Sequence, residues 1–373
     1  RSRASYRRIQ PPAPDPGRRC RGRKTGESLS AMAPSEKPLL LDEPTRKYDK
    51  GTKAERAAGL LAASVFSVTY VAAPIYITAA VLCFARYPFW PASWTLMAPL
   101  GLSLLIPCEA SAKLGPAILS TWAFRCIPKY FEFEEYHEVS DGEIAKSHAE
   151  GKRFIFCVHP HGVFSFCGVC AAVSAIMAPE GRGPNGITGI PTAAASVIKM
   201  TPFLRNIVSV FGVIDASNQV LTKRLKKQGG SIVIYVGGIV ELFSSSPKRE
   251  AVYLKKRKGF VKLALRTGAD IVPVYMFGNT TVLSVLSVWP LPDISRWMGV
   301  SVTFFWGRFG LPMPKKVKLS YARGRPLGLP HIAEPTQEDV DKWHAEYCKK
   351  LVELFDKYKG SNPDYKHKTL FIE

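Results

Sequence analysis

Two of the chain's seven histidines fall in one tetrapeptide, His159-Pro160-His161-Gly162. It follows the apolar run Phe154–Val158, which is typical of a buried strand. Ligands of open α/β sheets bind beyond the carboxyl ends of the strands. A neutral imidazole there is suited to take the proton of an alcohol that attacks an acyl thioester. Because proline stiffens the segment and glycine lets the backbone approach a substrate, we expect Pro160 and Gly162 to bind substrate in an acyl-transfer site.

The two histidines differ in their expected surroundings. We favour His161 as the general base, since a helix is expected to follow it and the positive end of a helix keeps an imidazole neutral. His159, at the tip of the strand, is the alternative base, and two hydrogen-bonded core histidines are the plainer interpretation. Zinc binding would need a third ligand at a spacing such as HxxxH, which the surrounding sequence lacks. We therefore expect no metal and no cofactor.

A second strand-like segment, Ser231–Val236, leads into Gly237 and Gly238, and Glu241 follows. Two glycines permit positive φ and expose backbone amides to a substrate, although such a pair is also common in simple turns. A carboxylate at Glu241 would hold the imidazole tautomer or orient the acceptor. We expect Gly237 and Gly238 to bind substrate and Glu241 to join the catalytic histidines.

A dense basic run, Lys255 to Lys258, opens onto a segment with helical spacing. Cations at a helix N-terminus bind phosphate groups well, and coenzyme A carries three phosphoryl groups. We expect Arg257, Lys258 and Gly259 to bind the donor acyl-CoA. A solvated or lipid-facing charge run is the alternative.

Two uncharged segments precede these motifs. Ala57–Ala85 and Tyr87–Cys108 extend for about 29 and about 22 residues, and about 20 apolar residues are enough to cross a bilayer as a helix. The prolines and aromatics of Arg86–Pro91 predict a turn between them, so we expect a membrane hairpin. Flanking Lys and Arg residues place both ends on the cytosolic side. Prolines in the second segment leave a re-entrant helix open, and buried helices of a soluble core are the other alternative.

The remaining sequence alternates strands with helices, which predicts an α/β fold with a mixed sheet flanked by helices, behind the N-terminal hairpin. Further strands are expected at Ile271–Tyr275 and Val317–Tyr321, and a closing amphipathic helix after the cap Thr336. The expected domains are a disordered basic, proline-rich tail (1–43), a membrane hairpin (44–112) and a cytosol-facing catalytic domain (113–373).

The net charge of +21 alone suggests a nucleic-acid partner, but its distribution does not support one. Residues 1–31 hold nine Lys and Arg against two acidic residues, so 9 − 2 = +7 of the excess belongs to the tail. An uncharged hairpin also argues against nucleic-acid binding. The CxxC formed by Cys167 and Cys170 has no second pair nearby, which makes redox or metal chemistry there a minor alternative.

Several ordered blocks together resemble the type 2 diacylglycerol acyltransferase family. The blocks are His159–Gly162, Val236–Gly238 with Glu241, Arg257–Ala264, Gly268–Asp270 with Val272-Pro273, Pro335–Gln337 and Leu354–Lys357. The resemblance implies an endoplasmic-reticulum and lipid-droplet enzyme that acylates diacylglycerol with acyl-CoA to give triacylglycerol. Monoacylglycerol and fatty alcohols are alternative acceptors. A non-catalytic lipid-droplet hairpin protein is the alternative from another class, and a homo-oligomer is left open.

The sequence departs from the related His-x4-Asp pattern, because Phe164 and Phe166 stand where the aspartate would follow His159 or His161. Glu241 is the expected replacement. The segment Lys129–Glu132 is similar to the family's Tyr-Phe-Pro block but lacks its proline.

Overall fold

The computed structural model describes residues 42–178, 190–227, 230–238, 240–241, 249–289, 291, 293, 295 and 303–373. Residues 1–41 of the expected tail lie outside this part of the chain, and the three domain boundaries stay predictions.

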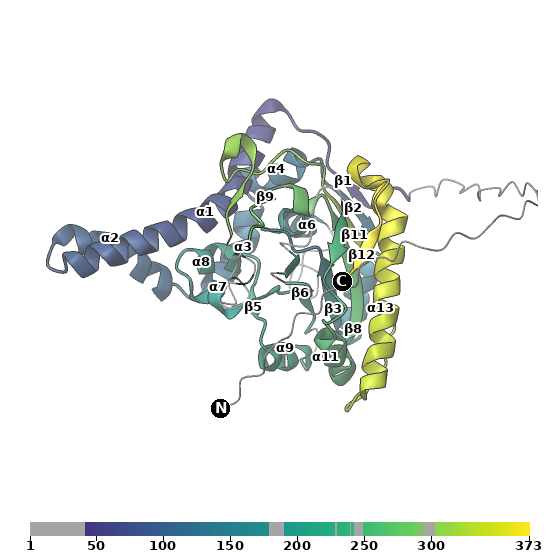
Figure 1. Ribbon diagram of the computed structural model, residues 1–373. Helices are drawn as coiled ribbons and strands as arrows, with labels where there is room; N and C mark the ends of the chain where they lie inside the picture. Colours follow the sequence, from purple (N-terminus) through teal and green to yellow (C-terminus); the bar gives the residue numbers. More distant parts are fainter. Residues whose placement is uncertain are drawn as a thin grey trace, which may run out of the picture. The chain divides into compact units, whose positions relative to one another are not determined.

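Helices and strands alternate after the hairpin (Figure 1). The helices are α1 (Lys53–Arg86), α2 (Pro91–Leu105), α3 (Cys108–Leu119), α4 (Trp122–Tyr130), α5 (Asp141–Ala149), α6 (Phe166–Met177), α7 (Ser196–Met200), α8 (Leu204–Ser209), α9 (Asn218–Leu225), α11 (Gly259–Thr267) and α13 (Gln337–Tyr358). The strands are β1 (Arg46–Lys47), β2 (Glu134–His137), β3 (Phe154–His159), β4 (Ala193–Ala194), β5 (Ile214–Asp215), β6 (Ile232–Tyr235), β7 (Glu250–Val252), β8 (Asp270–Phe277), β9 (Ser284–Val285), β10 (Phe305–Trp306), β11 (Ser320–Arg323) and β12 (Leu370–Ile372).

A six-stranded sheet in the order β1-β2-β11-β8-β3-β6 forms the centre. Strand β3 is parallel to both β8 and β6, while β11 is antiparallel to β8 and β1 is antiparallel to β2. The predicted mixed sheet flanked by helices is thereby confirmed. The fourth expected strand is shifted, because pairing with β8 and β2 begins only at Ser320 rather than at Val317.

The two faces of the sheet carry separate hydrophobic clusters, because neighbouring side chains of a strand point to opposite sides. From β3, Ile155 and Cys157 belong to the cluster that includes α11 and α13. Phe156 and Val158 belong to the cluster that includes α1, α4 and α6. We call these the α13 face and the α6 face. This alternation puts His159 on the α13 face with Ile155 and Cys157, while His161 lies beyond the end of the strand.

Helices α1 and α2 form the expected hairpin. A capping box at Thr52 begins α1, the chain turns after Arg86, and α2 begins with Pro91 in its first turn. The Tyr76 hydroxyl donates to the Leu96 carbonyl at 2.9 Å, which joins the two arms. By length and composition α1 is able to cross a membrane.

The second apolar segment is not one straight span. Helix α2 ends at Leu105, α3 begins at Cys108, and their axes are bent by 85°. Pro107 lacks an amide donor and disfavours helical geometry at the residue before it, so the chain breaks there. The geometry fits the re-entrant form that the prolines had left open.

Candidate active site

His159 is the last residue of β3, and its side chain lies on the α13 face. It is fully buried. Its Nδ1 lies 2.9 Å from Oε1 of Glu241, and its Nε2 lies 3.0 Å from the Tyr347 hydroxyl of α13. Both ring nitrogens are therefore engaged inside the core, which leaves His159 poorly placed to meet a substrate.

His161 lies on the other side of the sheet and lines a large cavity on the α6 face. Its Nδ1 is 2.6 Å from the carbonyl oxygen of Gly162. A carbonyl oxygen only accepts hydrogen bonds, so Nδ1 carries a proton, and in the neutral tautomer with this bond the lone pair is on Nε2. The ring packs edge-on against Tyr235, with 4.9 Å between centroids. His161 thus has the tautomer that a general base needs.

Glu241 connects the two histidines without touching the ring of His161. Its Oε1 contacts the His159 ring, while its Oε2 accepts the backbone N–H of His161 at 2.9 Å. The carboxylate is fully buried. A Cβ on Gly237 would collide with this carboxyl group, which explains the glycine at that position. Glu241 therefore holds the tetrapeptide in place, and its imidazole partner is His159.

Asn279, which the sequence reasoning missed, fixes the tetrapeptide from the opposite side. Its Nδ2 donates to the carbonyls of Pro160 and His161 at 3.2 and 2.9 Å, and its Oδ1 accepts the N–H of Cys167 in α6 at 3.1 Å. Gly162 has φ +64°, and a Cβ there would lie 2.8 Å from Nδ2 of Asn279. The sequence signal that could have identified Asn279 is its position as a polar residue two positions after β8, the strand that pairs with β3.

Asn279→Ala is expected to lower kcat by about 10²-fold, because small misplacements of a catalytic group have effects of that order. The substitution leaves the two carbonyls of the tetrapeptide without their donor. Steady-state rates of ester formation measure the effect. Thr281→Ala is a matched control, since its hydroxyl bonds Gly278 instead. Unchanged kcat in Asn279→Ala would show that the tetrapeptide holds its shape without this amide.

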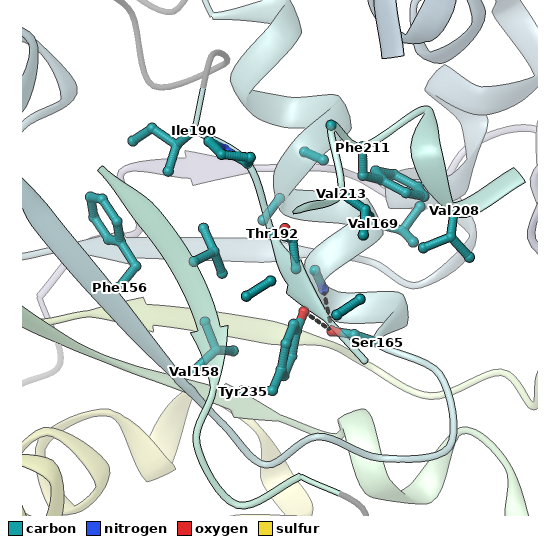
Figure 2. A pocket seen from close by; sticks show the side chains of 18 of the residues that line it. Phe156, Val158, Ser165, Val169, Ile190, Thr192, Val208, Phe211, Val213 and Tyr235 are labelled. Atoms are coloured by element: carbon teal, nitrogen blue, oxygen red, sulfur yellow. Dashed lines mark hydrogen bonds between the residues drawn. The ribbon is translucent and has the colours of Figure 1, made fainter. Parts of the chain in front are cut away.

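The cavity has a volume of about 850 Å³ and runs across the α6 face of the sheet (Figure 2). Apolar side chains make up most of its walls, among them Phe156, Val158, Val169, Val208, Phe211 and Val213. Tyr235 donates to Ser165, the N-cap of α6, at 2.8 Å. Of the residues predicted to form the site, His161 and Gly238 are among the described residues that line the cavity.

A family profile described as diacylglycerol acyltransferase matches residues 86–372, which includes the whole tetrapeptide site. The chain belongs to this family. The match covers more than half of the chain and confirms the resemblance drawn from the ordered sequence blocks.

This diacylglycerol acyltransferase family member is similar to human diacylglycerol O-acyltransferase 2, with 33% identity over 61% of this chain and 62% of the human protein. The zebrafish (Danio rerio) protein of the same name is 34% identical over 56% of this chain and 61% of that protein. Human 2-acylglycerol O-acyltransferase 3 is 32% identical, with 56% and 65% covered. The chain thus spans about two thirds or less of these relatives. A Thermotoga maritima 1-acyl-sn-glycerophosphate acyltransferase has a TM-score of 0.38 at 13% identity, over 80% of this chain and 95% of that one.

The basic segment of this family member lies away from the cavity. Lys258 is the N-cap of α11 and pairs with Asp341 of α13 at 2.7 Å, and the Arg257 guanidinium lies over the Tyr253 ring. The described residues that line the cavity do not include Arg257, Lys258 or Gly259. Their expected role in phosphate binding stays a prediction, and the cavity's own polar residues become the alternative contact for the donor.

The CxxC of the family member has the features of packing rather than chemistry. Cys167 and Cys170 lie on the buried side of α6, and burial raises the pKa of both thiols well above their usual value. A thiolate is the reactive form, so this shift works against redox chemistry and metal binding. Within the described ranges, His, Cys, Asp and Glu side chains form no cluster able to hold a metal ion.

Proposed function

We propose that this chain is an acyl-CoA-dependent acyltransferase that esterifies diacylglycerol to triacylglycerol, with His161 as the general base. The observation that carries the proposal is the position of His161, in the base tautomer, on the wall of a large apolar cavity. Family membership and the printed names of the relatives support the same reaction class.

In the proposed reaction, Nε2 of His161 takes the proton of the acceptor hydroxyl as its oxygen attacks the thioester carbonyl. The tetrahedral intermediate then collapses, the carbon–sulfur bond breaks, and the imidazolium returns the proton to the departing thiolate of coenzyme A. Every atom and proton balances between the two substrates and products. The reaction needs no metal, because the imidazole supplies the proton transfer.

The hairpin supports a lipid acceptor drawn from a membrane. Ser103 of α2 accepts the backbone N–H of Phe203 at 2.7 Å and donates to Asn206 of α8. Helix α8 in turn lines the cavity through Leu204 and Val208. The hairpin therefore contacts the cavity wall directly. We place the protein at the endoplasmic-reticulum membrane or a lipid droplet, with the catalytic residues on the cytosolic side, as the flanking charges predict.

Product analysis tests this function. The full chain, purified in detergent micelles, is given radiolabelled acyl-CoA with diacylglycerol, monoacylglycerol or a long-chain alcohol as acceptor. We expect labelled triacylglycerol as the main product. Preferred labelling of monoacylglycerol or of the alcohol would move the assignment to a related transferase. Absence of any ester from folded protein would favour the non-catalytic hairpin protein instead.

A further inference from the structure

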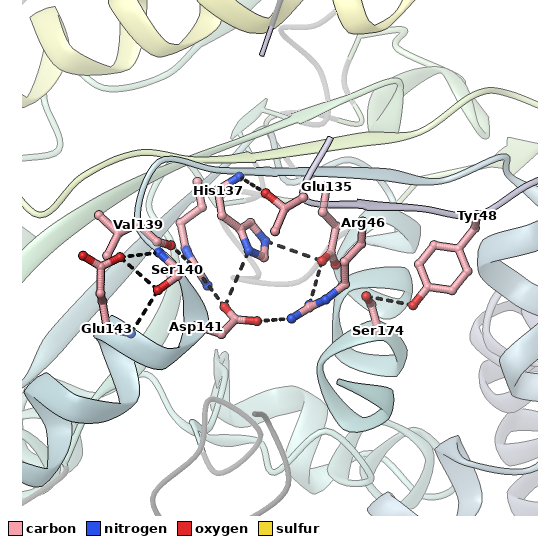
Figure 3. Close-up of polar contacts among 11 residues, drawn as sticks. Arg46, Tyr48, Glu135, His137, Val139, Ser140, Asp141, Glu143 and Ser174 are labelled. Atoms are coloured by element: carbon pink, nitrogen blue, oxygen red, sulfur yellow. Dashed lines mark hydrogen bonds and ion pairs between the residues drawn. The ribbon is translucent and has the colours of Figure 1, made fainter. Parts of the chain in front are cut away.

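A row of charged side chains lines the cavity at the edge of the sheet opposite β6 (Figure 3). Alternate residues of β1, β2 and β11 point to this face, and the first residue of α5 adds a carboxylate. We call this group the polar row, and its members are Arg46, Glu135, His137, Asp141 and Arg323. The apolar walls begin beside it, at Met276 of β8 and Val158 of β3.

The polar row is largely closed to solvent. The side chains of Glu135, His137, Asp141 and Arg323 are 2–3% exposed, and that of Arg46 is 20% exposed. Arg46 pairs with Glu135 at 2.9 Å and also with Asp141. Arg323 pairs with Asp141 at 2.7 Å and donates to the Val139 carbonyl. The two guanidinium charges are thus balanced by nearby carboxylates, so the row has no excess of positive charge for a phosphate, although Nε of Arg323 has no hydrogen-bond partner within the described chain.

His137 is one of three members of the row with a buried polar atom that makes no hydrogen bond within the described chain, the others being Asp141 at Oδ1 and Arg323 at Nε. The ring nitrogens of His137 lie 3.5 Å from Glu135 and 3.5 Å from Asp141, and within the described chain Nδ1 has no hydrogen-bond partner. Burial, followed by the charge of Arg323, lowers the pKa of His137 to about 3, so the ring is neutral. Burial raises the pKa of Glu135 to about 7 against the opposing charge of Arg46.

These features suit an uncharged ligand rich in amides and hydroxyls. Burying ion pairs is costly, and an apolar wall would serve an acyl chain at least as well. A neutral imidazole with an unpartnered nitrogen, in the same row as the unpartnered Nε of Arg323, supplies hydrogen-bonding atoms for such a ligand. The pantetheine arm of coenzyme A has this chemistry, with two amides and a hydroxyl between the thioester and the phosphates.

The distance from the polar row to His161 also fits that arm. Three strand spacings separate β2 from β3 in the order β2-β11-β8-β3, which is about 14 Å at about 4.8 Å per spacing. The arm contains the equivalent of about four peptide units, and at about 3.5 Å per unit it extends about 14 Å. A thioester beside His161 would therefore bring the hydroxyl-bearing outer end of its arm to the polar row.

We propose that the polar row binds the pantetheine arm of the acyl-CoA donor, with His137 as a hydrogen-bonding contact, while the acyl chain occupies the apolar part of the same cavity. The inference rests on the proposed function and refines it. It also moves donor recognition from the basic segment before α11 to the edge strands β1 and β2.

The test compares three donors with the same acyl group: acyl-CoA, acyl-pantetheine and the acyl thioester of N-acetylcysteamine, which lacks the outer arm. For the unaltered chain we expect similar KM values for the first two donors and a KM about tenfold higher for the third, the effect of roughly one hydrogen bond. Equal KM values for acyl-pantetheine and the N-acetylcysteamine thioester would overturn the proposal. If none of the three donors gave an ester product, the proposed acyltransferase function itself would be contradicted.

Variants assign the effect to His137. His137→Leu is expected to raise KM about tenfold for the two donors with a full arm and to leave it unchanged for the short donor. His137→Gln, which keeps a hydrogen-bonding side chain, is expected to restore part of the affinity. His367→Leu, the same substitution at an exposed histidine that does not line the cavity, is the control and should leave all three donor KM values unchanged. An equal rise for all three donors in His137→Leu would point to a structural role and contradict the proposal.

Discussion

Replacing His161 with alanine is expected to lower the rate of ester formation by roughly 10²–10⁴-fold, the usual contribution of a general base. The ring lines the cavity, and its Nδ1 proton is held by the Gly162 carbonyl, so in the proposed reaction Nε2 would meet the acceptor hydroxyl. The fold should survive, because the side chain is only partly buried and anchors no core contact comparable to those of His159.

The measurement is the initial rate of triacylglycerol formation in detergent micelles, with the unfolding temperature followed in parallel. His367→Ala is a matched control, since the same substitution falls on an exposed residue near the C-terminus. Turnover within twofold of the unaltered chain in both His161→Ala and His159→Ala would remove the tetrapeptide from the mechanism altogether.

Glu241→Ala is expected to reduce the free energy of unfolding by roughly 3 kcal/mol or more. The carboxylate is fully buried and accepts hydrogen bonds from the ring of His159 and from the backbone N–H groups of His161 and Tyr253. Its removal leaves these donors buried without partners. Activity should fall together with stability, because the tetrapeptide loses its anchor.

Denaturant unfolding followed by tryptophan fluorescence provides the measurement. Glu241→Gln is the conservative control, since an amide oxygen still accepts one of the bonds, and we expect it to retain about half of the lost stability. An unfolding midpoint for Glu241→Ala equal to that of the unaltered chain would show that the carboxylate does not contribute to the stability of the fold.

Local sequence signals predicted the elements well where the cause is local. Helix α11 follows the basic run as expected and ends at Gly268, and α13 begins after the expected cap Thr336, because glycine ends and capping boxes act within a few residues. The strand β3 likewise ends at His159 as expected. The break at Pro107 was only one of two options in the sequence, because how a proline bends a helix depends on what it packs against.

The candidate site was predictable in composition but not in arrangement. The tetrapeptide and Glu241 meet as expected, but the turn after β3, which Glu241 and Asn279 hold, brings His161 to the cavity while His159 stays in the core. Asn279 and Tyr347 join the site across 118 and 188 residues of chain, a distance over which no periodicity acts. The contacts of the polar row were unpredictable for the same reason, since Arg46 and Glu135 are 89 residues apart in the sequence.

The lengths of the hairpin arms bear on the kind of surface that the protein can occupy. Beyond Pro74, α1 continues for twelve residues to Arg86, about 18 Å at about 1.5 Å per residue, and the fifteen residues of α2 return about 22 Å. These two stretches are each shorter than a hydrocarbon core of about 30 Å, whereas the whole of α1 is long enough to cross one. A hairpin inserted over these two stretches alone would re-emerge on the side where it entered and would require no water beyond the lipid. It is therefore compatible with a phospholipid monolayer spread over an oil phase as well as with a complete bilayer.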